Sequence, residues 1–144
     1  AAAKPVSSRS GMNRTSETSP VYPAWLDESQ PLFERGVAAL EARDLEALGT
    51  AMRESYLLMF ATMLAARPPI IYWQPETVAV IHEAESMRAD GLPVWETMDA
   101  GPQVKLLTTH EHVARVSERV RAVVPGADLI VAGPGGEPEV HRDG

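Results

Sequence analysis

An aspartate stands between two short apolar runs in the second half of the chain. Residues 98–102 read Met-Asp-Ala-Gly-Pro. Because Asp, Gly and Pro are common turn residues, an Asx turn at the end of a strand explains Asp99 by itself. A carboxylate held at a strand end, with the small residues Ala100 and Gly101 beside it, equally suits a group that accepts or orients a hydroxyl proton in phosphoryl transfer. The local residues leave both interpretations open, and the catalytic one requires Asp99 to face a pocket.

Hydroxyl groups and a guanidinium gather near the start of the sequence. Residues 7–11 read Ser-Ser-Arg-Ser-Gly, and Arg14 follows within the next turn. Backbone N–H groups at a helix start, serine hydroxyls and the planar fork of Arg9 together form a favourable site for a phosphate group. A solvated serine-rich loop with a helix cap is the competing interpretation, because short motifs often match by chance.

Two further patterns carry less chemistry. His110 and His112 have the spacing of metal ligands, but residues two apart on a helix point in different directions, so we assign no metal site to them. Residues 133–136 read Gly-Pro-Gly-Gly and lack the Lys and Ser/Thr of a P-loop. We interpret them as a turn that follows a strand.

Composition bounds the class of protein. The chain has 144 residues, which is enough for one domain with a core. Its net charge of −7 disfavours a nucleic-acid partner. No apolar run approaches the roughly 18 residues of a membrane span, and the absence of cysteine excludes disulfides and thiolate metal sites. We expect a cytoplasmic protein that binds neither nucleic acid nor a membrane.

Apolar residues at helical spacing and capping residues predict five helices. The expected helices are a short one that opens at Ser10 or Gly11, then residues 28–43, 45–66, 75–90 and 110–124. Asp44 and Thr109 are the expected N-caps of the third and the last helix, and Pro75 suits the first turn of the fourth. The buried stripe expected for the second helix consists of Leu32, Phe33, Val37 and Leu40.

Three short apolar runs predict strands. Residues 94–98 and 104–108 flank the Asp99 turn and predict a hairpin, and residues 129–132 predict a last strand. Helices mixed with strands that neighbour each other in sequence indicate an α+β fold, in which an antiparallel sheet carries helices packed on one face.

Six stretches together resemble the diphosphomevalonate decarboxylase family of the GHMP kinase superfamily, in both order and spacing. They are residues 7–12 (Ser-Ser-Arg-Ser-Gly-Met), 17–20 (Glu-Thr-Ser-Pro), 61–63 (Ala-Thr-Met), 68–73 (Pro-Pro-Ile-Ile-Tyr-Trp), 97–102 (Thr-Met-Asp-Ala-Gly-Pro) and 133–136 (Gly-Pro-Gly-Gly). The resemblance implies that residues 1–144 form the C-terminal domain of such an enzyme, with an α+β fold. It also implies a fragment, since the N-terminal nucleotide-binding half of the family is absent from this chain.

The resemblance implies a defined reaction. Family members use ATP and Mg²⁺ to phosphorylate the tertiary 3-hydroxyl of mevalonate 5-diphosphate, and then lose phosphate and carbon dioxide to give isopentenyl diphosphate. By this resemblance Asp99 is the catalytic aspartate that orients or deprotonates the hydroxyl, and Ser8 and Arg9 hold the substrate's phosphates. The implied substrate-binding residues are Ser7, Ser8, Arg9, Gly11, Met12 and Ala100.

The same resemblance implies partners outside this chain. The N-terminal half of the family supplies most of the ATP and Mg²⁺ site, so the isolated 144 residues are not expected to turn over substrate. Family members are often homodimers, so a homodimer is the expected assembly.

Two residues depart from the family pattern. Gln103 stands where the family usually has Asn, and Phe60 stands where it usually has His. Because relatives act on the monophosphate or phosphorylate without decarboxylating, a phosphomevalonate decarboxylase is an alternative. Asp99 argues against the kinase-only relatives, which lack that aspartate. A non-catalytic module that binds phosphate ligands is the alternative of another class.

Overall fold

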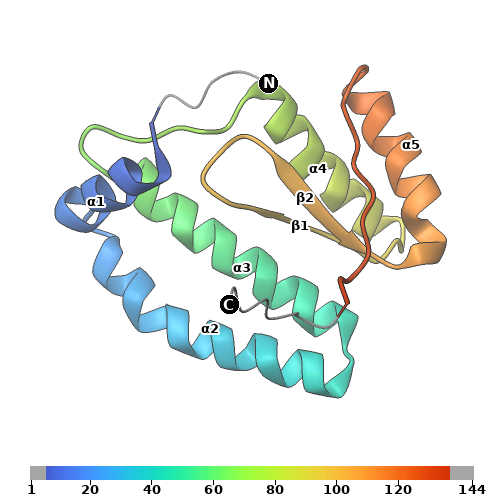
Figure 1. The fold of residues 1–144 in the computed structure, drawn as a ribbon, viewed down its shortest axis with the longest axis horizontal. Coiled ribbons are helices and arrows are strands. Elements are labelled where there is room, and N and C mark those ends of the chain that lie inside the picture. The colour runs from blue at the N-terminus through green and yellow to red at the C-terminus, as the bar shows by residue number, and fades with distance from the viewer. Residues whose placement is uncertain (1–5, 137–144) are drawn as a thin grey trace, which may run out of the picture.

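Five α-helices and one β-hairpin follow one another along residues 6–136, the part of the chain described by the structure, which is a computed structural model. The elements are α1 (Ser8–Thr18), α2 (Tyr22–Ala42), α3 (Leu45–Leu64), α4 (Pro75–Ala89), β1 (Val94–Met98), β2 (Val104–Thr108), a 3-10 turn (His110–His112) and α5 (Val113–Val123). Figure 1 shows α3 and α4 beside the hairpin, α5 beyond α4, and α2 outside α3. The expected α+β class is confirmed.

The hairpin forms as the sequence predicts. β1 and β2 pair antiparallel, from Val94 opposite Thr108 to Met98 opposite Val104. Side chains alternate across a strand, so Val94 and Met98 share one face of β1, and both are buried in the core. Residues 99–103 close the hairpin at the end that points toward α1 (Figure 1).

Capping residues place α3 and α4 where the sequence predicts them. The Asp44 carboxylate accepts the N–H of Ala47 at 2.9 Å, which satisfies one of the free donors at the start of α3. Pro75 opens α4, where its missing N–H costs no hydrogen bond. Gly91 follows α4 with φ of 83°, a backbone conformation that glycine adopts without strain.

The expected buried stripe of α2 is wrong for three of its four residues. α2 begins at Tyr22, before the expected start, and continues through Pro31. Leu32 is buried, but Phe33 and Leu40 are 65% and 61% exposed, and Val37 is also exposed. α2 packs mainly against α3, and the side turned to it carries Leu32 and Ala39. One neighbouring helix covers only a narrow stripe, so the adjacent apolar stripe remains in solvent.

The boundaries of the first and last helices also differ from the expectation. α1 begins at Ser8, before the expected start at Ser10 or Gly11, because Ser7 is its cap. Thr109 does not cap α5: it precedes the 3-10 turn, and its hydroxyl makes no capping hydrogen bond. Val116 and Val120 of α5 are buried, as the periodicity predicts.

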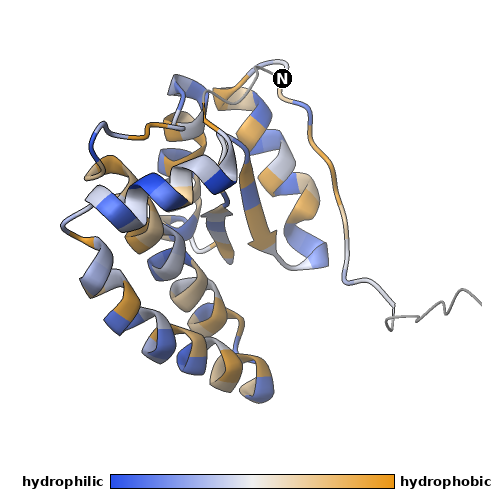
Figure 2. Ribbon diagram, turned by 60° about the vertical axis from the view of Figure 1, so that its left-hand side comes forward, coloured by the Kyte–Doolittle hydropathy of each residue, from blue (hydrophilic) through white to orange (hydrophobic). Residues whose placement is uncertain are grey.

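The strand expected at residues 129–132 does not form. The described segment that follows α5 is extended but pairs with neither strand, and Ile130 is 95% exposed. Figure 2 shows an apolar run in this segment, and Leu129 packs against the core group that contains Met87 and Val116. A strand requires hydrogen bonds to a neighbour, and no described segment provides one here, so the apolar composition alone does not create the strand.

Two groups of buried side chains form the core. One joins α3 to the connection between α3 and α4 and contains Phe60, Ile70 and Tyr72. The other joins α4, the hairpin and α5 and contains Ala84, Met87 and Val116. Val104 of β2 packs against both groups, so the hairpin connects the two parts of the core.

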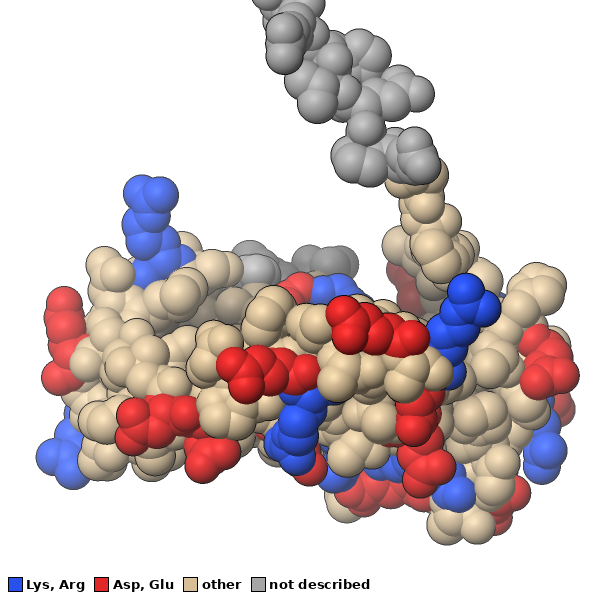
Figure 3. All heavy atoms as spheres, turned by 90° about the horizontal axis from the view of Figure 1, so that it is seen from below, with Lys and Arg blue, Asp and Glu red and all other residues tan. Residues whose placement is uncertain are grey.

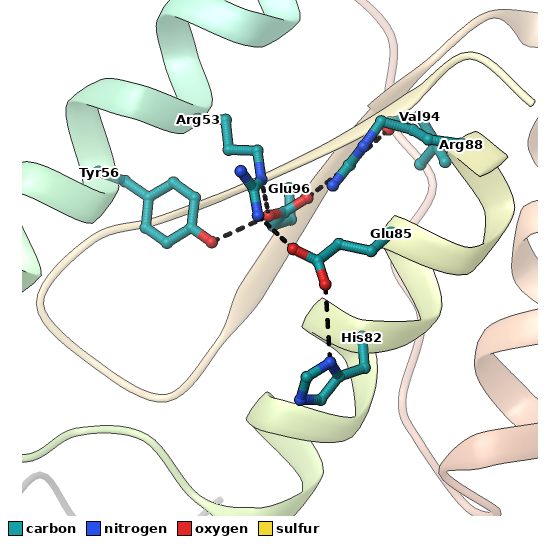
Figure 4. A network of polar contacts seen from close by, with 7 residues as sticks. All are labelled: Arg53, Tyr56, His82, Glu85, Arg88, Val94 and Glu96. Carbon is teal, nitrogen blue, oxygen red and sulfur yellow. Dashed lines mark hydrogen bonds and ion pairs between the residues drawn. The ribbon is translucent and has the colours of Figure 1, made fainter.

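A buried carboxylate ties β1 to α3 and α4 (Figure 4). Glu96 has no exposed surface, and it accepts hydrogen bonds from Arg53 at 2.6 Å, from Arg88 at 2.7 Å and from the Tyr56 hydroxyl at 3.0 Å. Arg53 also pairs with Glu85, so two guanidinium groups face two carboxylates. This balance keeps the desolvated charge of Glu96 compensated.

The surroundings of Glu96 have opposite effects on its pKa. Burial by itself raises the pKa, but the hydrogen bonds from Arg88, from the backbone and from Arg53 hold it below its ordinary value of 4.5. Because the folded state has the lower pKa, Glu96 contributes stability that is present above the unfolded value. That contribution is lost as the pH falls through the folded value.

We expect Glu96→Gln to lower the free energy of unfolding by about 3 kcal/mol at pH 7, because a neutral amide leaves Arg88 without a countercharge and Arg53 with Glu85 alone. The difference from the wild type should shrink as the pH falls below 4.5. Urea denaturation across this pH range measures both effects. Glu54→Gln, which removes one partner of the exposed Arg35–Glu54 pair, is the control and should cost less than about 1 kcal/mol. Equal losses for the two variants would contradict a structural role for Glu96.

A second prediction concerns the contact between α3 and β1. A Cβ atom on Gly49 would lie 2.2 Å from the Trp95 ring, so Gly49→Ala should destabilise the fold by about 1–3 kcal/mol in spite of alanine's higher helix propensity. Gly36→Ala on α2 is the matched control, since nothing lies within 4 Å of its Cβ position. Thermal unfolding should show a gain of roughly 0.5–1 kcal/mol for that control.

Candidate active site

The hairpin loop holds the Asp99 backbone firmly. Met98 and Gly101 on either side are buried, and the Thr77 hydroxyl of α4 donates a hydrogen bond to the carbonyl of Pro102 at 2.9 Å. Ala100 packs against the core group that contains Phe60 and Tyr72. These contacts fix the end of β1 on α4, as expected for a positioned carboxylate.

The Asp99 side chain does not lie in a pocket, contrary to the expectation. It is 83% exposed and forms an ion pair with Lys105. Lys105 lies opposite Thr97 in the hairpin, and Thr97 and Asp99 are two residues apart, so both charges project from the same face. No described residue covers this face of the loop closely enough to bury Asp99, which is the physical reason for the difference.

The hydrogen bonds do not support an Asx turn at Asp99. Among residues 6–136, its carboxylate pairs with Lys105 and accepts no backbone N–H, so the Asx turn does not form. The side chain is therefore free of a structural task in the turn. Lys105 was not among the residues singled out from the sequence, because an exposed lysine on a strand is an ordinary surface feature.

The start of α1 presents polar groups to solvent. Ser7 is the N-cap, and its hydroxyl oxygen accepts the N–H of Ser10 at 3.2 Å, so the helix-cap interpretation holds for this residue. Ser8, Arg9 and Met12 are exposed. The first N–H groups of a helix have no partner within the helix. The first turn of α1 therefore offers hydroxyl, guanidinium and N–H donors to an anion.

Gly11 serves the packing of α1 against the core. It is buried, and a Cβ atom there would lie 3.2 Å from the Tyr72 hydroxyl and 3.6 Å from Ile70. The Tyr72 hydroxyl donates a hydrogen bond to the carbonyl of Val6 at 3.0 Å, just ahead of the cap. Burial raises the pKa of Tyr72, and the nearby charge of Arg14 partly offsets this rise. Gly11, named from the resemblance as a substrate-binding residue, therefore contacts Tyr72 on its buried side.

One segment brings the two candidate groups to the same end of the molecule. α1 packs on Ile70 and Tyr72 through Gly11, and Ala100 packs on the core group that includes the same two residues. Figure 1 shows the hairpin loop pointing toward α1, with the connection between α3 and α4 alongside. The start of α1 and the Asp99 loop therefore both pack on this core group.

Phe60, the departure from the family pattern, lies in the core beneath these elements. It is 1% exposed, meets Tyr56 and Tyr72 edge-on, and lies 5.4 Å from Trp73 between ring centroids. Such aromatic pairs favour a phenyl ring over a polar ring at this position. Among the described residues, the Trp73 indole N–H is the buried side-chain polar group without a hydrogen-bond partner.

Gln103, the second departure, is exposed at the start of the return to β2. It lies in the loop that Thr77 anchors through Pro102. Nothing in the structure explains the replacement of Asn by Gln.

The described residues offer no evident metal centre or membrane segment. Within residues 6–136, no three His, Asp or Glu side chains gather closely enough to hold a metal ion. Over the same range, no helix combines the length and apolar character needed to cross a bilayer.

Comparisons with known proteins identify a matching family and several relatives. The family model described as "Mevalonate 5-diphosphate decarboxylase C-terminal domain" matches residues 1–136. A phosphomevalonate decarboxylase of Haloferax volcanii is 35% identical over 103 residues, which are 71% of this chain and 31% of that protein. The chain thus spans about a third of that relative's length.

Solved structures show the same fold. Mevalonate pyrophosphate decarboxylase from Streptococcus pyogenes matches 97% of this chain and 43% of its own chain, with a TM-score of 0.87 and 31% identity. A structure of MDDEF in complex with MVAPP, AMPPCP and magnesium matches 81% of this chain and 36% of its own chain, with a TM-score of 0.79 and 36% identity. The chain therefore belongs to the mevalonate 5-diphosphate decarboxylase C-terminal domain family.

Proposed function

We propose that this chain is the C-terminal domain of an ATP-dependent decarboxylase that converts mevalonate 5-diphosphate to isopentenyl diphosphate. The observation that carries the proposal is the Asp99 carboxylate on a fixed hairpin end, whose loop packs on the same core group as the donor-rich α1. Membership of the family supports the reaction class. The solved relative bound to MVAPP supports a phosphorylated substrate.

In this proposal Asp99 orients or accepts the proton of the substrate's 3-hydroxyl. A phosphoryl group from ATP converts that hydroxyl into a phosphate, which leaves far more readily than hydroxide. When the carboxylate carbon departs as carbon dioxide, the bonding electrons form the new double bond as phosphate leaves. Ser8 and Arg9 hold the diphosphate end of the substrate, so that the reacting carbon lies near Asp99.

ATP and Mg²⁺ are the proposed cofactors, in keeping with the AMPPCP and magnesium of the related complex. In keeping with the family resemblance, we place their binding mainly in a nucleotide-binding half outside this chain. The isolated domain is then expected to be inactive. A homodimer and a cytoplasmic location stay predictions.

A phosphomevalonate decarboxylase is the second candidate, favoured by the Haloferax volcanii relative of that name. The two candidates share Asp99 and differ in the number of phosphates that the α1 end must hold. Turnover of the monophosphate and the diphosphate by the full-length protein separates them. Binding of either compound without release of carbon dioxide would instead support a non-catalytic phosphate-binding module.

We expect Asp99→Asn to lower the kcat of the full-length protein by at least about a hundredfold, because the amide has the shape of the carboxylate but does not accept a proton. ATP-dependent carbon dioxide release measures the effect. Asp128→Asn, at an exposed position after α5, is the control with the same charge change. Near-normal turnover by Asp99→Asn would refute the proposed role.

Arg9 tests the substrate-binding part of the proposal separately. Arg9→Gln should raise KM for the phosphorylated substrate by about tenfold or more and change kcat less, because it removes a contact made equally in the ground and transition states. Arg115→Gln on the exposed side of α5 is the control. A fall in kcat with an unchanged KM would contradict a binding role for Arg9.

A further inference from the structure

A groove of about 590 Å³ runs along one side of α1 and reaches the connection between α3 and α4. Three arginines line it: Arg9 and Arg14 from α1, and Arg67 from the connection. The remaining lining residues are Ser7, Ser10, Asn13, Glu17 and Thr18. The groove thus has three guanidinium groups and one carboxylate, in a chain whose net charge is −7.

The arginines of the groove differ from the paired ones of the fold. Those that form ion pairs within residues 6–136 are Arg35, Arg53, Arg88 and Arg119. Over the same residues, Glu17 forms no ion pair with its neighbours in the groove, so the three guanidinium groups there have no carboxylate partner in contact. The surface over α2, by contrast, displays many acidic side chains with few basic ones between them (Figure 3). The α1 groove is therefore a place where three arginines without an ion pair among residues 6–136 line one hollow.

Hydrogen bonds fix the two sides of the groove relative to each other. The Arg67 N–H donates to the Thr18 hydroxyl at 2.8 Å, and that hydroxyl donates to the carbonyl of Arg14 at 2.7 Å. Thr18 therefore joins the backbone of the connection to that of α1. At the other end of the groove, the bond from Tyr72 to Val6 fixes the start of the helix.

We propose that Arg14 and Arg67 form, with Arg9, an anion subsite that binds a phosphate group of a diphosphate-bearing ligand. Arg9 and Arg14 are five residues apart, which is about 7.5 Å along a helix. A single phosphate at the start of α1 therefore leaves Arg14 and Arg67 available for a second anionic group. Guanidinium groups bind phosphate oxygens through paired N–H donors, which suits this ligand class.

This subsite goes beyond the proposed function, which assigns the substrate's phosphates to Ser8 and Arg9 only. Binding of diphosphate at the groove can be measured without turnover of a substrate. The diphosphate group has two possible sources. It belongs either to the substrate or to a separate phosphorylated ligand. Competition distinguishes them: inorganic diphosphate that displaces mevalonate diphosphate indicates the substrate, and simultaneous binding indicates a separate ligand.

The test is calorimetric titration of the full-length protein with inorganic diphosphate. We expect Arg14→Gln and Arg67→Gln each to weaken binding by about tenfold, and the double variant to weaken it further. Arg121→Gln, which removes the same charge from the exposed side of α5, should bind like the wild type. Arg14→Lys keeps the charge without the planar fork, and should lie between the wild type and Arg14→Gln.

Equal affinity of the wild type and the double variant would overturn the subsite, as would an equal loss in Arg121→Gln. Unchanged thermal unfolding of the variants shows that they remain folded. Asp99→Asn separates the two proposals, because it should lose turnover and still bind diphosphate. If Asp99→Asn remains active while the Arg14 and Arg67 variants bind weakly, the subsite stands and the proposed function fails. If Asp99→Asn is inactive while the Arg14 and Arg67 variants bind diphosphate like the wild type, the proposed function stands and the subsite fails.

Discussion

The contact of Tyr72 with the start of α1 determines where the candidate site lies. Its hydroxyl donates to the Val6 carbonyl, and Gly11 packs against the same oxygen atom closely enough that a larger residue would be crowded. The ring is 1% exposed and meets Phe60 edge-on in the core. The Asp99 loop packs on the same core group through Ala100, so the donor-rich turn and the carboxylate share one support.

Two carboxylates on neighbouring elements have opposite environments and therefore opposite tasks. Glu96 is fully buried, and every nearby cation or hydroxyl is used to compensate its charge. Such a group is costly to protonate and stabilises the packing of β1 on α3 and α4. Asp99, three residues later, is exposed and has one lysine beside it. Only the second has oxygens available for a substrate.

Local signals were sufficient to predict some elements. Asp44 caps α3 and Pro75 opens α4 because each acts within one turn of the chain, and the hairpin follows from two short runs separated by a turn. Local signals gave wrong predictions where burial or strand pairing depends on a residue far away in the sequence. α2 carries two adjacent apolar stripes, and only its packing on α3 selects Leu32 over Phe33 for burial. Residues 129–132 have the composition of a strand, but no described neighbour pairs with them.

The site was predicted in part for the same reason. A helix cap in the serine-rich stretch and a turn at Asp99 follow from nearby residues, although the cap is Ser7 and lies ahead of the expected start. The pocket that the catalytic interpretation requires at Asp99 is not formed by the described residues, since a pocket depends on what lies opposite the loop. The sequence did not predict that Arg67 lies beside α1, because the two are far apart in the chain. Arg67 and Arg14 are linked through the Thr18 hydroxyl. The pairing of Glu96 with Arg53 likewise spans 43 residues, a separation that no periodicity reveals.

The exposure of Asp99 limits what this domain can do without a second surface. In water, the pair with Lys105 is screened, and an exposed ion pair of this kind contributes little energy. A carboxylate stabilises charge that develops during a reaction only when water is excluded and the surrounding dipoles are fixed. The described residues fix the backbone beneath Asp99 but leave its carboxylate open. In the proposed function, catalysis by Asp99 therefore requires a second surface opposite the hairpin loop, and that surface also determines how closely the proposed substrate approaches Asp99.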